Sequence, residues 1–266
     1  MNFRPYVILP FVAALVPVLI TLAMASSPSL ATALKMEVFV VRIVALTAVL
    51  VAANAFDRGD YMQRAWLTYG LAPAFIMIRD LLFTFWLTRE SGTPSEYVEA
   101  LLIFLANAGQ IVGVWMLSRA WQIAGIELPG SSHRRALLIG IGTLIGIAVT
   151  GPSMALNLGD ALRGEVFGLV ALISGIGDIV SFAFIVPVVL TAIAMRGGLL
   201  FWPWGLLTAS LAAWLLCDLT GLLRHIVGDA AFTLAWRETF RTLACAFCLS
   251  AGIAQHAVNS RDVALP

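Results

Sequence analysis

Runs of about 20 apolar residues, separated by short polar connections, fill almost the whole sequence. A run of roughly 20 residues, at about 1.5 Å per residue, is long enough to cross the hydrocarbon of a bilayer as a helix. Hydrophobic residues make up 61 % of the 266 and charged residues only 12 %. A soluble domain carries about a quarter of charged residues. The sequence therefore predicts an all-α, polytopic membrane protein.

The apolar runs predict eight membrane spans. Seven of the eight tryptophans support the limits of these spans, because indole rings favour the membrane–water interface and only Trp214 lies in mid-span. The connections are too short to hold a soluble catalytic domain, so we expect a single integral membrane domain over 1–266. The predicted spans are 6–25, 37–56, 66–88, 97–118, 136–158, 168–194, 201–223 and 235–257.

The first run has two interpretations. A basic start, an apolar stretch and a small-residue motif ending at Ala25 are typical of a cleaved signal peptide. The stretch is long for the apolar region of a signal peptide, however, and it contains Pro10 and Pro17. We therefore expect the first run to be retained as a helix, with cleavage as the alternative.

Arginine and lysine are distributed unequally between alternate connections. Basic residues are enriched on the cytoplasmic side of membrane proteins, so the side with more of them, which carries both termini, is predicted to be cytoplasmic. Acidic residues, among them Glu96 and Glu99, lie mainly on the other side. The richer side has Arg4, Arg58, Arg64, Arg119, Arg134, Arg135, Arg196 and Arg261, and the other has Lys35, Arg89, Arg163, Arg224 and Arg237.

Two segments of the chain share a sequence pattern. R-G-x6-W-x13-D occurs at 58–80 and again at 196–218 without a gap. The offset equals four predicted spans, so both copies would run in the same direction through the membrane. This predicts two four-helix halves, 1–130 and 131–266, related by an axis along the membrane normal. Four identities leave chance similarity open as the alternative. The matched residues are Arg58, Gly59, Trp66 and Asp80 with Arg196, Gly197, Trp204 and Asp218.

Charged side chains within the predicted spans share one depth. A charge that faces lipid costs about 2.5–3.5 kcal/mol, so these side chains should face protein or water and form pairs. Counting the helical rise from the outer end of each span places them in one layer of the outer half. Neighbouring residues point about 100° apart on a helix, so Arg79 and Asp80 are expected to reach different helices rather than each other. The layer comprises Arg42, Arg79, Asp80, Asn107, Asp178, Asp218 and Arg241.

These seven residues are the candidate ligand-binding residues. Arg42, Arg79 and Arg241 could hold an anionic or carbonyl-bearing ligand, because guanidinium groups bind such groups through paired hydrogen bonds. The three aspartates could orient the arginines, hold a cation or take up protons. The alternative is a closed salt-bridge network that fixes the helix registry and binds no ligand.

The remaining features identify no cofactor, no metal site and no nucleic-acid partner. A net charge of +1 gives no basic patch for nucleic acid. Lys35 is the one lysine, so no later helix could carry a retinal Schiff base. The three cysteines lie in apolar runs and are interpreted as packing residues rather than metal ligands. The glycine-rich segments 140–151 and 173–178 predict close helix packing.

The segment 177–219 resembles the multi-helix membrane sensor modules that precede histidine kinase or diguanylate cyclase domains in bacteria. The features that match are Asp178, the basic turn that begins at Arg196, the dipeptide Pro203-Trp204, and Asp218. The resemblance implies a receptor or regulatory module in the bacterial cytoplasmic membrane, with no enzymatic role of its own. Because no output domain follows, we expect a separate signalling protein as its partner.

The sequence thus predicts a non-enzymatic sensory or regulatory protein that binds a small anionic or lipid-like ligand in its outer-half charge layer. A pocket closed toward the cytoplasm would favour this function. Three alternatives remain. A secondary transporter would have a polar path leading inward past Asn107 and Gln110. A lipid-modifying enzyme would use two or three aspartates as metal ligands or acid–base groups. An accessory subunit would present a lipid-facing groove at Trp214 or at the glycine-rich helices.

Overall fold

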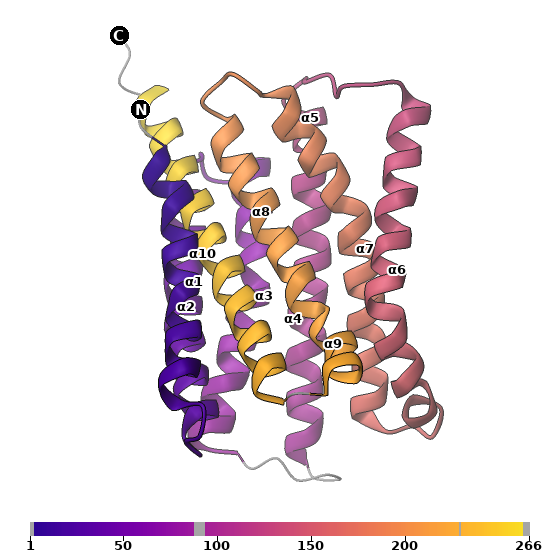
Figure 1. The fold of residues 1–266 in the computed structure, drawn as a ribbon. Helices are drawn as coiled ribbons and strands as arrows, with labels where there is room; N and C mark the ends of the chain where they lie inside the picture. Colours follow the sequence, from indigo (N-terminus) through magenta and orange to yellow (C-terminus); the bar gives the residue numbers. More distant parts are fainter. Residues whose placement is uncertain (1–2, 88–93, 229, 263–266) are drawn as a thin grey trace.

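The computed structural model describes residues 3–87, 94–228 and 230–262, and all regular structure in these residues is helical. The long helices run side by side in one bundle (Figure 1). The start of the first helix and the end of the last lie together at the upper end in Figure 1, here called the terminal end. The helices are α1 Arg4–Met24, α2 Leu30–Ala53, α3 Tyr61–Phe85, α4 Pro94–Ser118, α5 Ala120–Ile123, α6 Ser132–Leu162, α7 Val166–Ala194, α8 Phe201–Asp218, α9 Thr220–Val227 and α10 Ala230–Asp262.

Each of the eight predicted spans overlaps one long helix, although several of the ends differ. Six of the helices, namely α1 to α4, α6 and α7, are long and apolar enough to cross a membrane. α8 has only 18 residues and includes Trp202, Pro203 and Asp218, while α10 carries Arg237 and Arg241 near its start. These polar and indole side chains make α8 and α10 less apolar than the other six helices, although both run through the same bundle (Figure 1).

The predicted span 201–223 is too long at its C-terminal end. α8 ends at Asp218, and after Leu219 the chain forms the separate short helix α9. At this point Trp236 donates its indole N–H to the carbonyl of Leu216 at 2.7 Å, and the Thr220 hydroxyl donates to the carbonyl of Cys217. Asp218 therefore lies at the end of a helix and not inside a longer one.

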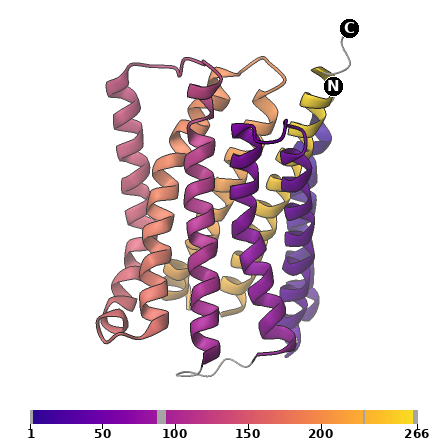
Figure 2. The same cartoon turned by 180° about the vertical axis from the view of Figure 1, so that it is seen from behind.

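Six helices form a closed ring. In the order α2, α3, α4, α7, α8 and α10, each helix packs against the next, and α10 returns to α2. The other two long helices lie outside this ring. α1 packs against α10 and α6 packs against α7, so that they form opposite edges of the bundle in both views (Figures 1 and 2). The ring encloses the polar side chains described below.

Small residues allow neighbouring helices to approach closely. A Cβ at Gly146 of α6 would lie 3.1 Å from the Cα of Ile179 and 3.2 Å from the Cβ of Phe182 on α7. The segment 140–151 therefore packs against α7, as predicted from its glycines. A closer approach joins α4 to α3, where a Cβ at Gly113 would lie 2.5 Å from the Cα of Tyr69.

Replacing Gly113 by alanine is expected to destabilise the protein by about 1–3 kcal/mol, because the added methyl group forces α3 and α4 apart. Gly140 provides the matched control, since a Cβ there meets nothing within 4 Å. The Gly140→Ala protein should unfold at the wild-type temperature or slightly above it, because alanine favours helix more than glycine does. Thermal unfolding in detergent, followed by tryptophan fluorescence, measures both. Equal unfolding temperatures for the two variants would contradict the close approach of α3 and α4.

The terminal end of the ring has an apolar core. Five of its members, each from a different ring helix, are at most 2 % exposed: Val49, Trp66, Leu117, Val188 and Leu207. Each of these residues lies within about two helical turns of the terminal end of its helix. This inner core closes the ring at the terminal end, and it leaves the polar interior to the other half of the bundle.

The outside of the bundle is apolar. Leu22, Leu144 and Leu162 are 73 %, 66 % and 80 % exposed, and many smaller apolar side chains surround them. Contiguous apolar surface on this scale is unusual for a protein in water and normal for one in lipid. The exposed surface and the six long apolar helices are those expected of an integral membrane protein.

Candidate functional site

A cavity of about 330 Å³ lies inside the ring, in the half away from the termini. All six ring helices contribute to its wall, whereas α1 and α6 do not. Pockets for small molecules begin at about 300 Å³. The cavity brings together six of the seven candidate residues predicted from the sequence, namely Arg42, Arg79, Asn107, Asp178, Asp218 and Arg241.

Asp80, the seventh candidate, is the shared acceptor of two arginines. One carboxylate oxygen forms a salt bridge with Arg42 of α2. The other accepts hydrogen bonds from Nε and Nη2 of Arg79 at 3.0 and 2.6 Å. The expectation that Arg79 and Asp80 would not pair is therefore wrong. The two Cβ atoms do point apart, but the long arginine side chain bends back far enough to reach the neighbouring carboxylate.

Glu99 of α4 belongs to the same group of charges. Nε of Arg79 lies 4.0 Å from the Glu99 carboxylate on α4, and Glu99 is only 5 % exposed. The sequence prediction placed Glu99 with the outer acidic residues, because it lies near the start of a span. In the structure, Arg42, Arg79, Asp80 and Glu99 link α2, α3 and α4 at the wall of the cavity.

Arg241 of α10 is paired within its own helix. It donates to both carboxylate oxygens of Glu238, one turn earlier, at 2.9 and 3.2 Å. Glu238 is 2 % exposed and also accepts from Arg237 at 2.7 Å. The nearby Glu37 of α2 accepts from the Thr242 hydroxyl at 3.0 Å. Sequence reasoning missed both glutamates, although the i, i+3 spacing of Glu238 and Arg241 is a helical ion-pair pattern.

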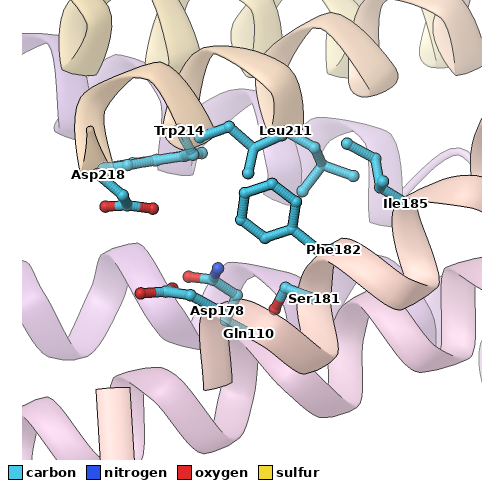
Figure 3. A pocket seen from close by; sticks show the side chains of 9 residues that line it. Gln110, Asp178, Ser181, Phe182, Ile185, Leu211, Trp214 and Asp218 are labelled. Atoms are coloured by element: carbon cyan, nitrogen blue, oxygen red, sulfur yellow. The ribbon is translucent and has the colours of Figure 1, made fainter. Parts of the chain in front are cut away.

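Asp178 and Asp218 differ from the other charged residues. Neither carboxylate forms a hydrogen bond or a salt bridge with any residue that the structure describes. Asp178 lies on α7 and Asp218 on α8, and Figure 3 shows their carboxylates facing the same space with Gln110 beside them. The cavity therefore has two groups of paired charges and one pair of carboxylates without partners.

A second, smaller cavity of about 20 Å³ continues from these carboxylates toward the terminal end. A site of this size has room for about one water molecule. The hydroxyl of Ser181 is buried in its wall and has no hydrogen-bond partner among the described residues. Both cavities share Gln110, Asp178, Trp214 and Asp218 in their walls.

Two further side chains define the cavity wall. Asn107 of α4 donates to the Ser174 hydroxyl of α7 at 2.7 Å and so joins these helices beside the cavity. Trp214, the one tryptophan predicted in mid-span, lines both cavities. An accessory subunit with a lipid-facing groove at Trp214 is therefore disfavoured.

The three aspartates do not form one metal site. Asp80 is held by Arg42 and Arg79, whereas Asp178 and Asp218 lie at another part of the wall. Within the described part of the chain, no three His, Cys, Asp or Glu residues form a group that could hold a metal ion. An enzyme that uses all three aspartates as ligands of one metal ion does not fit this arrangement.

Toward the terminal end, both cavities are closed by apolar side chains. Leu211 lines the end of the smaller cavity, and Val188 and Leu207 of the inner core lie beyond it. Two buried hydroxyls at this level donate to backbone carbonyls, Thr191 to Pro187 and Ser210 to Ala244, each at 2.8 Å. The Thr208 hydroxyl and the Trp66 indole N–H are also buried and have no hydrogen-bond partner among the described residues. These polar atoms are isolated within the apolar core and form no chain of hydrogen bonds with one another.

No protein-family model, no curated protein and no solved structure matches this chain. The resemblance of segment 177–219 to membrane sensor modules stays a prediction, and function has to be inferred from the cavity itself. The cavity offers room for a small molecule, arginines held by carboxylates, two carboxylates without a hydrogen-bond partner among the described residues, and an apolar core at one end.

Proposed function

We propose that this protein is a non-enzymatic membrane receptor or regulator that binds a small organic molecule in the cavity of the six-helix ring. The observation that carries the proposal is a cavity of about 330 Å³ with polar and apolar walls, next to a buried apolar core. Closure toward the terminal end favours ligand binding from one side over passage through the bundle.

The charges at the wall support this proposal over a purely structural role. The groups around Asp80 and Glu238 behave as a closed salt-bridge network, which was the alternative considered for the whole layer. Asp178 and Asp218 do not belong to that network, because they have no partner among the described residues. Unpaired ionisable groups inside a membrane protein are costly and mark functional sites by default.

We further propose that α8 and α10 also cross the bilayer, which gives eight spans in two related halves. The ring supports this arrangement, because both helices are needed to close it. α3 and α8 occupy opposite places in the ring, and each carries an aspartate of the repeated pattern, Asp80 and Asp218. A relative tilt of the two halves would then relay occupancy of the cavity to a partner protein.

The proposed orientation places the terminal end in the cytoplasm of a bacterium, so that the cavity lies in the outer half of the membrane. The excess of basic residues at that end supports it. Arg119 and Arg135 lie over the rings of Trp115 and Trp121 at 5.2 and 5.9 Å, a pairing suited to a membrane–water interface. Arg89, Arg224 and Arg261 were also counted for the sequence prediction, and the structure does not describe their side chains.

Native mass spectrometry of the protein in detergent tests whether the cavity holds a molecule. We expect the wild type to retain a co-purified small molecule, and Ala106→Leu to lose it, because Ala106 is buried in the cavity wall. Ala155→Leu makes the same change on the exposed face of α6 and should retain the molecule. A wild-type protein that binds no molecule, whether co-purified or added, would overturn the proposal and favour a structural role.

A transport assay separates a receptor from a secondary transporter. The molecule identified by mass spectrometry is offered to proteoliposomes that contain the wild-type protein, with and without a proton or sodium gradient. A receptor binds it without accumulation in the lumen. Accumulation driven by a gradient would show that the inner core opens, and the protein would then be a transporter.

A further inference from the structure

We infer that the ligand is an organic cation whose ammonium group lies between Asp178 and Asp218. The inference rests on the proposed function and names the chemical class of the ligand. It departs from the anionic ligand expected from the sequence, because the arginines have carboxylate partners, whereas the two aspartates have no hydrogen-bond or salt-bridge partner among the described residues.

The first group of charges is balanced without a ligand. Arg42 and Arg79 share the carboxylate of Asp80, and Arg79 also approaches Glu99 at 4.0 Å. Two guanidinium groups therefore face two carboxylates. An anion that entered here would have to displace a carboxylate held by the protein itself, so this group is a poor receptor for an anionic ligand.

The second group is also balanced. Arg237 and Arg241 share the carboxylate of Glu238, and Glu37 lies close enough to interact with Glu238. Two positive charges again face two negative ones. Only the arginines of these two groups line the cavity, but each group as a whole has no net charge. Asp178 and Asp218 form no hydrogen bond or salt bridge with any described residue, although Arg241 interacts electrostatically with Asp218 at longer range.

A cation at Asp178 and Asp218 resolves this imbalance. The two carboxylates lie close enough to interact electrostatically and face the same space (Figure 3). Like charges in a site shielded from water repel each other strongly, and a cation between them replaces that repulsion by two attractions. An ammonium group donates up to three hydrogen bonds and accepts none, which suits two carboxylates without donors of their own.

The surroundings of the two carboxylates offer further contacts that suit an ammonium group. Figure 3 shows Trp214 one turn from Asp218 on α8, with Gln110 and Ser181 on the opposite side. The face of an indole ring attracts cations. The amide oxygen of Gln110 and the buried, unpartnered hydroxyl of Ser181 are additional acceptors at the smaller cavity, reached directly or through a water molecule.

The size and lining of the larger cavity favour an organic cation over a bare metal ion. Its volume of about 330 Å³ is far greater than an ion needs, and Ala72, Pro73, Ile76 and Ala106 give it an apolar wall. Such a wall gains free energy by excluding water from carbon-bearing parts of a ligand. The ammonium group would lie at the two aspartates, and the rest of the molecule would fill the space toward α3 and α4.

Two sets of matched probes test the charge of the ligand at constant ionic strength. One set is 2-phenylethylammonium, 2-phenylethanol and phenylacetate, and the other is butylammonium, butanol and butyrate. Dissociation constants are measured from the rise in unfolding temperature with probe concentration. We expect at least one ammonium probe to bind about 10-fold or more tightly than its neutral and anionic analogues, as a charge-assisted hydrogen bond would give.

Single substitutions then locate the site. Asp178→Asn and Asp218→Asn are each expected to weaken binding of the ammonium probe about 10-fold or more, because each removes one charged acceptor. Asp160→Asn makes the same change at a surface carboxylate that pairs with Arg163, and it should leave binding unchanged. Equal weakening by all three variants would contradict a site at the two aspartates.

Failure of this inference can be told apart from failure of the proposed function. If native mass spectrometry finds a molecule in the cavity but no ammonium probe binds better than its analogues, the ligand class is wrong and the receptor proposal stands. Stabilisation by sodium or calcium chloride, lost in both aspartate variants, would assign the carboxylates to an inorganic cation and overturn the inference. A cavity that takes up neither a co-purified molecule nor any probe would overturn both.

Discussion

Asp80→Asn is expected to destabilise the protein by about 3–5 kcal/mol, the usual effect of removing one partner from a buried ion pair. Asp80 is the common acceptor of Arg42 and Arg79, whose side chains are only 6 % and 21 % exposed. Asparagine keeps the size of the side chain but removes the charge, so Arg42 loses its carboxylate and Arg79 retains only the more distant Glu99. The unfolding temperature in detergent should fall by more than for Gly113→Ala.

A double-mutant cycle shows whether the loss comes from the ion pair. Arg42→Gln in the Asp80→Asn protein removes the unpaired charge on α2, so the double variant should be more stable than the sum of the two single effects predicts. Asp160→Asn provides the surface control, because its pair with Arg163 is exposed and should contribute about 0–1 kcal/mol. Strict additivity, or a loss at Asp80 no larger than at Asp160, would contradict a buried pair.

The depth of the charged residues could be predicted from the sequence because it depends on one regular quantity. Each residue of a helix advances by about 1.5 Å, so counting from the ends of the apolar runs places a charge at its level in the bundle. Arg42, Asp178 and Arg241 come from three helices, and the structure brings them to one cavity, as the shared depth implied. The number and position of the long helices follow from apolar runs in the same way.

The pairing of the charges could not be predicted in this way, because it depends on side-chain reach and on local helix ends. Arg79 bends back to Asp80 along a path that the direction of the Cβ atoms does not reveal. Glu99 was predicted to lie with the outer acidic residues and Glu238 was missed, yet both are buried. Near the end of α8, the carbonyl of Leu216 accepts a hydrogen bond from Trp236, which is distant in the sequence.

The two copies of the repeated pattern show both what the sequence predicts and what it does not. Asp80 and Asp218 match in the repeat and lie on opposite helices of the ring, but their surroundings differ. Asp80 has two arginine partners, whereas Asp218 has none among the residues described. A matching position in two halves therefore predicts a similar place in the fold, and the neighbouring side chains decide whether the residue stabilises the bundle or remains available to a ligand.

The net charge of the cavity also predicts how it selects reagents from solution. We expect a cysteine placed in its wall to react at least about 10-fold faster with a cationic methanethiosulfonate than with an anionic one, because a cleft lined by negative charge concentrates cations. Ile76→Cys provides such a position without removing a charge, in a protein whose Cys217, Cys245 and Cys248 are replaced by alanine.

Two controls make this rate ratio specific to the cavity. Ser26→Cys is exposed in the connection between α1 and α2, at the same end of the bundle as the charged residues, and gives the intrinsic ratio of the two reagents. Adding Asp178→Asn and Asp218→Asn to the Ile76→Cys protein should return the ratio to that of Ser26→Cys, because these substitutions remove the unbalanced charge.

Membrane vesicles of both orientations show from which side the reagent enters, and reaction from the terminal side alone would contradict a cavity sealed by Val188 and Leu207. A preference for the anionic reagent would instead mean that the arginines set the potential, and an anionic ligand would then be favoured.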